Sequence, residues 1–267
     1  KKSFVIDGKQ IARISLPKML PLVLFEPQDL QLLNGSPELR RDFLDNLLAQ
    51  TASGYDKTLK DYRRTLSQRN SLLKKGANIA RTQLFAWDIR LSELGGQLAQ
   101  SRHQLVKTID AQMEGIYKKL SGRKNTINAS YVSSISLEHY ASQMLSKLEA
   151  SRDLDLIRGF TAHGPHRDDL EILLDNYPAA QTASRGEVRT LVLALKIQEL
   201  KLLEAERGKK PLLLLDDVFS ELDGKRRQAL TDFLKNYQTF ITTTDADVVV
   251  QHFMDKATII PVSVTKS

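Results

Sequence analysis

Two adjacent carboxylates, Asp216 and Asp217, follow a run of four leucines at residues 212–215. This run predicts a buried strand, because a strand covered on both faces needs apolar residues at successive positions. Open α/β sheets bind ligands at the carboxyl ends of their strands, which is where these acids stand. The run therefore indicates a metal site. An ordinary core strand that ends in a solvated acidic turn explains it equally well.

A second segment has the features of a phosphate site. Ser184 precedes an apolar-periodic stretch and Glu187 stands three residues later, the spacing of a capping box at the start of a helix. Gly186 would let a ligand approach the free backbone N–H groups there. A plain capped surface helix is the alternative for this segment alone.

Together these segments resemble the motifs of ABC-type ATPases, in the same order and at similarly close spacing. The leucine run with its acids resembles Walker B, S-E-L-D at residues 220–223 resembles the D-loop, and S-R-G-E at residues 184–187 resembles the signature motif. The resemblance implies an α/β ATPase head with a largely parallel sheet, in which the signature of one subunit meets ATP bound to the other.

Further strings narrow the resemblance to the RecF family. They are F-E-P-Q-D-L at 25–30, G-S-P-E-L-R-R-D-F-L-D at 35–45, G-P-H-R-D-D-L at 164–170 and L-L-L-D-D-V-F-S-E-L-D at 213–223. The similarity runs from about residue 20 to about residue 250. Strings 35–45 and 164–170 are the specific ones, since Walker B and the signature are shared across the ABC class.

The resemblance assigns roles to single residues. Asp216 would order Mg²⁺ through water, and Asp217 stands where many ABC ATPases have a catalytic Glu. The residues implied to meet nucleotide are Ser184, Arg185, Gly186, Gln28, Asp223 and Thr243. Asp223 would align the dimer across the nucleotide. For Thr243, a role in positioning water and simple capping of a strand end are both open.

The resemblance also implies a function. Two heads would close on ATP and Mg²⁺ as a homodimer and bring two basic arms onto DNA. The resemblance implies action at gaps between single- and double-stranded DNA, with RecR, to help load RecA, and a cytoplasmic location. Two alternatives remain: a chromosome-organising SMC-like head, and a non-catalytic DNA or protein interaction module.

The chain contains no P-loop sequence, G-x-x-x-x-G-K-[S/T]. The Gly-Lys pairs at residues 8, 208 and 224 are followed by Gln, Lys and Arg, so none can form that phosphate cradle. The resemblance places the loop before the region where this chain starts. We therefore expect a piece of a longer protein that binds ATP poorly by itself, with a natural degenerate ATPase as the alternative.

The composition limits the possible number of domains and the class of protein. The 267 residues are 41% hydrophobic, enough for one large domain or two smaller ones. Zero cysteines exclude a disulfide framework and thiolate metal sites, which fits a reducing cytoplasm. No stretch approaches 18 consecutive apolar residues, so we expect no membrane-spanning segment.

Charge is concentrated in the middle of the chain. Residues 36–150 hold 18 Lys or Arg and 11 Asp or Glu, whereas the remainder holds 21 of each. A one-sided basic region is typical of nucleic-acid binders. The predicted DNA contacts are Arg63, Arg64, Lys74 and Lys75. A solvated helical face would carry the same charges.

The predicted organisation is an α/β head interrupted by a helical arm: head strands at 1–35, arm at 36–150, and the signature and Walker B half at 151–267. The expected elements are a hairpin at Asp7-Gly8, strand 20–25, helices over 37–120, strand 126–135, helix 137–149, strand 170–174, the signature and Walker B elements, a helix after Asp223, strand 240–243, helix 248–253 and strand 258–264. Gly76 and Gly95-Gly96 are expected to interrupt the arm helices.

His163 and His166 are close in sequence to Asp168 and Asp169, and these residue types could act as metal ligands. The resemblance instead favours a structural or nucleotide-proximal loop, with Arg167 paired to an acid.

Overall fold

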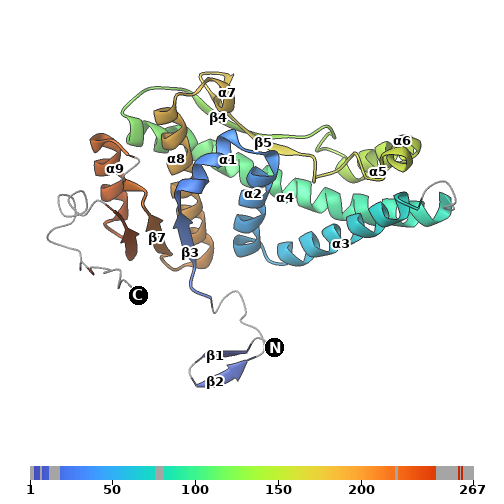
Figure 1. Ribbon diagram of the computed structural model, residues 1–267, viewed down its shortest axis with the longest axis horizontal. Coiled ribbons are helices and arrows are strands. Elements are labelled where there is room, and N and C mark those ends of the chain that lie inside the picture. Colours follow the sequence, from blue (N-terminus) through green and yellow to red (C-terminus); the bar gives the residue numbers. More distant parts are fainter. Residues whose placement is uncertain are drawn as a thin grey trace, which may run out of the picture.

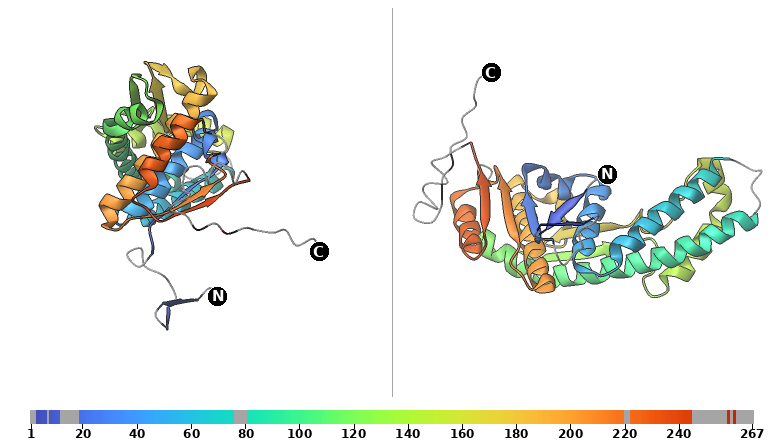
Figure 2. Two further views of the ribbon diagram at one scale, coloured as in Figure 1. Left: turned by 90° about the vertical axis from the view of Figure 1, so that its left-hand side faces the viewer. Right: turned by 90° about the horizontal axis from the view of Figure 1, so that it is seen from below.

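The structure is a computed structural model that describes residues 3–6, 8–11, 19–75, 81–219, 222–244, 258 and 260. The molecule is elongated, with a broad end of sheets and helices and a helical arm extending from it (Figures 1 and 2). None of the described helices is long and apolar enough to cross a membrane. The predicted hairpin is confirmed, because β1 (Phe4–Ile6) pairs antiparallel with β2 (Lys9–Ile11).

A parallel sheet forms the centre of the broad end. Its strand order is β3 (Leu22–Phe25), β7 (Leu212–Asp216), β8 (Thr239–Thr242), with Phe25 beside Leu215 and Asp216 beside Thr242. Leu213 and Leu215 of the leucine run are buried, whereas Leu212 and Leu214 are only partly buried. The leucine run is therefore buried on one face and half-open on the other, so the expectation of a fully buried strand is only half right.

Helix α8 (Arg185–Arg207) lies against this sheet and is the central helix of the molecule. Its residues from Thr190 to Leu200 are all buried, which is the pattern of a helix packed on every side. The neighbours of α8 include η2 (Pro27–Leu30), α1 (Gln31–Asn34) and α2 (Pro37–Thr51). Helix α9 (Gly224–Leu234) follows the D-loop and packs against the far end of α4.

The arm is a pair of helices, α3 (Tyr55–Leu73) and α4 (Arg81–Ser121), with α5 (Tyr140–Ala150) and α6 (Arg152–Arg158) beside them (Figure 1). The prediction that Gly95-Gly96 interrupts a helix is wrong, because α4 runs through both. A Cβ on Gly95 would lie 2.7 Å from Met144 Sδ of α5. The glycines therefore permit close helix packing. Gly76 lies outside the described residues.

A second, antiparallel sheet lies along α4 and joins β4 (Ile127–Val132), β5 (Asp169–Leu174) and β6 (Tyr177–Pro178). The strand expected at 170–174 is present, but it does not belong to the parallel sheet. Asp175 and Asn176 both have positive φ, 51° and 68°, and form a two-residue hairpin turn. A hairpin turns the chain straight back, so its strands are antiparallel.

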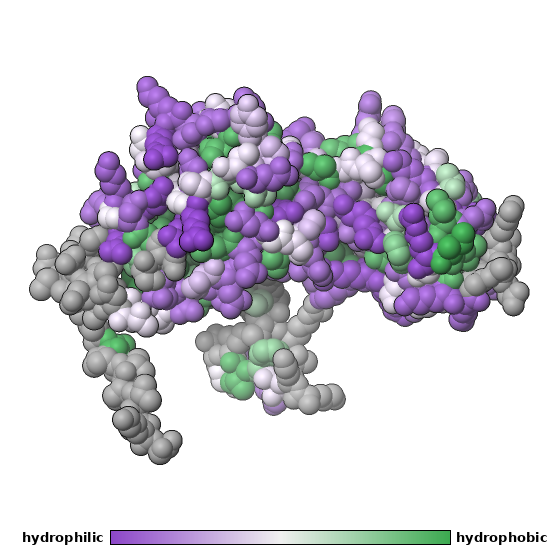
Figure 3. Space-filling model, turned by 45° about the horizontal axis from the view of Figure 1, so that its top comes forward, coloured by the Kyte–Doolittle hydropathy of each residue, from purple (hydrophilic) through white to green (hydrophobic). Residues whose placement is uncertain are grey.

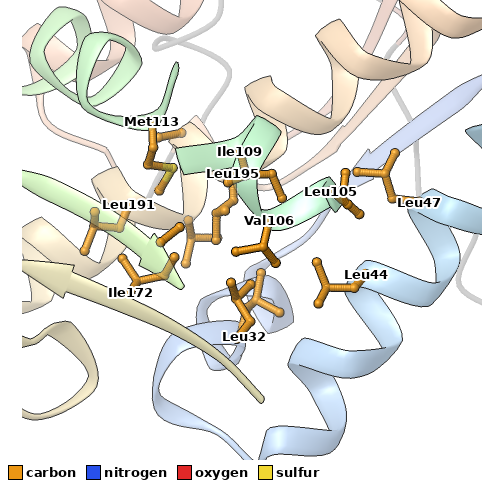
Figure 4. Packing of buried hydrophobic residues seen from close by; sticks show 14 of the residues in the cluster. Leu32, Leu44, Leu47, Leu105, Val106, Ile109, Met113, Ile172, Leu191 and Leu195 are labelled. Carbon is orange, nitrogen blue, oxygen red and sulfur yellow. The ribbon is translucent and has the colours of Figure 1, made fainter. Parts of the chain in front are cut away.

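One hydrophobic core extends through both parts of the molecule. Leu44 of α2, Val106 and Ile109 of α4, and Leu191 and Leu195 of α8 meet in it (Figure 4). The short helix α7 (Ala179–Thr182) lies against β5 and α1. The division of the chain at residues 35 and 150 stays a prediction. Of the elements predicted at 248–253 and 258–264, only residues 258 and 260 lie inside the described part.

Candidate nucleotide site

Asp216 ends β7 at the carboxyl edge of the parallel sheet. Its side chain is exposed, and its Oδ1 accepts a hydrogen bond from the hydroxyl of Thr242, which is its partner in β8. An exposed carboxylate beside a hydroxyl can order Mg²⁺ through water, since Mg²⁺ prefers oxygen ligands and keeps several waters. The residues therefore fit that ion, although the described residues contain no cluster of three or more His, Cys, Asp or Glu that would hold a metal.

Asp217 turns the chain away from the strand. Its φ is 48°, in the left-handed region that Asp and Asn tolerate better than other side chains. Its N–H donates to the carbonyl of Thr242 at 3.0 Å. Thr243 follows β8 directly, and Gln28 lies exposed in η2 just past β3. All of these positions share one edge of the sheet, because β3, β7 and β8 run parallel.

Ser184 caps α8 as the sequence predicted. Its hydroxyl oxygen accepts the N–H of Glu187 at 3.4 Å, while Glu187 Oε2 accepts the Ser184 N–H at 2.9 Å and the hydroxyl at 2.7 Å. These bonds, led by the one from the hydroxyl, hold the pKa of Glu187 below its usual range. Ser184 and Arg185 are exposed and Gly186 is half-exposed, so the helix start is open to an anion.

The D-loop and the signature segment are linked by residues that the motif analysis did not single out. Asp223 caps α9, accepting the Arg226 N–H at 3.0 Å. The Arg226 side chain pairs with Asp223 and also donates to Thr190 of α8 at 2.6 Å. Thr190 follows Gly186 by one helical turn, and that spacing was the one sequence signal for it. Ser220 and Glu221 of the D-loop lie outside the described residues.

The two family-specific strings contact each other at the root of the arm. Arg40 forms two parallel hydrogen bonds to Asp169, at 2.7 and 2.8 Å, and Arg41 donates to the carbonyl of Asp168 at 2.9 Å. The carboxylate of Asp168 accepts the hydroxyls of Tyr131 and Tyr140. The strings at 35–45 and 164–170 therefore fasten the second sheet to the helices.

Two buried arginines of the arm form further ion pairs. Arg102 of α4 forms two hydrogen bonds to Asp45, at 2.8 and 3.0 Å, and donates to the Pro165 carbonyl at 2.6 Å. Arg69 of α3 is fully buried and pairs with Asp88 and Asp155. Losing one partner of such a pair leaves an uncompensated buried charge, which costs about 3–5 kcal/mol.

His166 has a structural role. Thr161 O can only accept, so His166 Nε2 carries the proton and donates to it at 3.1 Å, and Nδ1 accepts from the Tyr62 hydroxyl at 2.7 Å. With both nitrogens occupied, His166 has no lone pair for a metal. Among the described residues Arg167 forms no ion pair with an acid; its guanidinium donates to the carbonyl of Thr161 at 3.4 Å and lies 5.1 Å from the centre of the Phe160 ring.

The predicted DNA contacts lie on α3 and its C-terminal end. Arg63, Arg64, Lys74 and Lys75 are exposed, and Arg63 also pairs with Asp42 at 3.3 Å and with Asp45 at 3.4 Å. Arg63 and Arg64 lie on α3 itself, whereas Lys74 and Lys75 follow its last residue, Leu73.

No protein-family model matches the chain. Among curated proteins, it is 40% identical over 256 residues to the DNA replication and repair protein RecF of Halothermothrix orenii, covering 92% of this chain and 68% of the relative. It is 37% identical over 253 residues to RecF of Enterococcus faecalis, covering 91% and 66%. The chain thus spans about two thirds of the length of these relatives.

Solved structures agree with this similarity. The structure of the recombination mediator protein RecF with ATP in the RecFOR pathway superposes with a TM-score of 0.83 at 31% identity, covering 92% of this chain and 68% of that one. The corresponding RecF-ATPrS structure gives 0.80 at 31% identity, covering 90% and 67%. The chain therefore belongs to the RecF family.

Proposed function

We propose that the chain is part of an ATP-gated DNA-binding protein of DNA replication and repair, which closes as a homodimer around ATP and Mg²⁺. The observation that carries this proposal is the open start of α8. There, Ser184, Arg185 and Gly186 face solvent and are linked through Arg226 to the D-loop. The relatives named for DNA replication and repair, and the RecF structure with ATP, support it.

The proposed chemistry is hydrolysis of ATP by a slow switch. Bound Mg²⁺ would neutralise the charge that develops on the β- and γ-phosphate oxygens, and Asp216 would hold it through water. Asp217 would orient the water that attacks the γ-phosphorus. A shorter acid than the usual Glu reaches this water less well, which favours slow turnover. The products are ADP and phosphate, and the dimer opens when phosphate leaves.

The signature residues would act on the opposite subunit's ATP. Gly186 would donate its backbone N–H to the γ-phosphate, and Arg185 would add a positive charge. The Ser184 hydroxyl donates to Glu187 in this structure, so it must turn away from Glu187 to donate to phosphate. Asp223 would align the two heads. Gln28 and Thr243 would approach the metal and the attacking water from the sheet edge.

The arm would contact DNA. Arg63 and Arg64 on α3, with Lys74 and Lys75 just past its end, present exposed positive charge, which suits the phosphates of a duplex and gives no sequence preference. We further propose gapped DNA as the target, RecR as a partner, loading of RecA as the outcome and the cytoplasm as the location. These follow from the family and from the RecFOR pathway named for its solved structure.

A second candidate function, protein docking on the arm, is favoured by exposed apolar side chains there. Leu154 and Ile157 of α6 are 53% and 82% exposed, and Phe160 is 41% exposed. Figure 3 shows apolar surface near the free end of the arm. Phosphate contacts do not need such groups, whereas protein interfaces use them.

Sedimentation of the full-length protein with and without ATP tests the main proposal. The parent should dimerise with Mg-ATP, and Ser184→Arg should stay monomeric while binding ATP with unchanged affinity, because Ser184 serves the opposite subunit. The 267-residue chain alone should show no micromolar Mg-ATP binding by calorimetry. A parent that stays monomeric at saturating ATP would rule the closed dimer out.

A further inference from the structure

Arg226 extends from α9 to the start of α8. Its Nε donates to Thr190 Oγ1 at 2.6 Å, and its guanidinium lies 3.5 Å from where a Cβ on Gly186 would stand. The side chain is only 16% exposed, whereas that of its anchor Asp223 is 56% exposed and its other anchor, Thr190, is fully buried. It is therefore a packed bridge between two helices rather than a free surface cation.

The hydrogen bonds of this bridge have a fixed direction. Thr190 has one hydroxyl proton and donates it to the carbonyl of Gly186 at 2.7 Å. Its oxygen is then left to accept from Arg226, which is the bond observed. The order Arg226 to Thr190 to Gly186 is thus set by the chemistry of the hydroxyl. A serine at position 190 would preserve this order of hydrogen bonds, and a valine would abolish it.

The other end of the bridge is Asp223. Its carboxylate caps α9 by accepting the Arg226 N–H, and it also pairs with the Arg226 guanidinium. The backbone bond is the largest cause that holds the pKa of Asp223 below its usual range, so the group stays charged at neutral pH. The Asp223 side chain remains 56% exposed and faces outward as well.

We propose that Arg226 is a positioning residue that holds Asp223 and Gly186 at a fixed spacing, so that Asp223, at the start of α9, and the signature segment move as one body. The inference rests on the proposed ATP-closed dimer, in which both segments meet the opposite subunit's nucleotide. The D-loop also leads back to Asp217 and Asp216, so the bridge joins the partner's ATP to this subunit's own catalytic edge. Turnover at the two sites would then be coupled.

The sharpest test compares Thr190→Val with Thr190→Ser in the full-length protein. Both change one group at a buried position, but only valine removes the hydroxyl. We expect Thr190→Val to leave the ATP affinity of the monomer within twofold, to weaken ATP-dependent dimerisation at least tenfold, and to remove cooperativity in ATP. Thr190→Ser should behave like the parent. Equal dimerisation by Thr190→Val, or equal failure of both variants, would overturn the proposal.

A double-mutant cycle tests Arg226 itself. If Arg226 and Thr190 act as one bridge, Arg226→Gln combined with Thr190→Val should dimerise no worse than either single variant. Additive losses would mean that the two residues act independently, which contradicts the bridge.

Hydrogen exchange on the 267-residue chain without nucleotide separates this inference from the proposed function. Exchange in the first turn of α8 should be faster in Thr190→Val than in Thr190→Ser. If the parent forms no ATP dimer, the proposed function fails. If the parent dimerises but the two Thr190 variants exchange and dimerise alike, only the bridge fails.

Discussion

Asp217 can be tested by a substitution that keeps its backbone. Its φ of 48° is one that Asn adopts readily, so Asp217→Asn preserves shape and removes only the charge. In the full-length protein we expect hydrolysis to fall about 100-fold while Mg-ATP binding and the ATP dimer persist. Steady-state turnover with sedimentation checks this. Asp216→Ala is the contrast, since it should lose Mg²⁺ and the dimer together; parental turnover in Asp217→Asn would remove Asp217 from its assigned role.

His166 makes stability depend on pH. Burial lowers its pKa from 6.5 to about 4, so the folded state resists the proton that the unfolded chain accepts. Stability from this group is therefore complete above pH 6.5 and falls as the pH drops toward 4, by up to about 3 kcal/mol. Urea unfolding of the chain at pH 7 and pH 4.5 measures the fall.

His166→Asn should show a smaller fall than the parent over that range, because Asn does not titrate. His139→Asn is the matched control, since His139 is exposed and should leave the fall unchanged. The same fall in all three proteins would mean that other groups, such as the buried Asp168, set the pH dependence.

At the level of elements, Gly95 and Gly115 form a natural comparison within α4. A side chain at Gly95 would meet Met144 and Pro165, whereas Gly115 has nothing within 4 Å of its Cβ position. We expect Gly95→Leu to destabilise by about 1–3 kcal/mol through overpacking. Gly115→Leu should stabilise by about 0.5–1 kcal/mol, because leucine favours the helix over glycine. Chemical denaturation measures the stability of both variants. Equal changes in stability would show that α5 moves to accommodate the new side chain.

Local signals predicted the elements that carry the motifs. The capping box at Ser184 and the leucine run before Asp216 lie where the sequence placed them, because caps and apolar runs act over a few residues. The sequence did not reveal that β5 belongs to the antiparallel sheet, because this depends on its pairing with β4, which lies 37 or more residues away in the chain. It also misread Gly95-Gly96, because a close helix approach and a helix break both favour glycine. Arg226 was missed since its partner Thr190 is 36 residues away.

At the scale of the whole molecule, DNA binding should depend on salt and on the arm. The chain should bind duplex DNA weakly, with affinity that falls steeply between about 50 and 200 mM salt as counterions are released. Charge reversal of Arg64 on α3 and of Lys75 just past its end should weaken binding about tenfold. Reversal of Lys209 and Lys210, just past α8, is the control and should have little effect. Fluorescence anisotropy with labelled duplex measures both, and equal losses would exclude α3 as the DNA surface.

The length of helix α4 would convert a small tilt at one end into a large displacement at the other. Its 41 residues form one continuous rod from the free end of the arm to α9, with a length of about 60 Å. A rod of that length multiplies small rotations, so a tilt of about 5° where it meets α8 and α9 would carry the far end through about 5 Å. A small movement of the α8 and α9 end of α4, of the size that making or losing one phosphate contact causes, would then displace the free end of the arm by about the pitch of one helical turn.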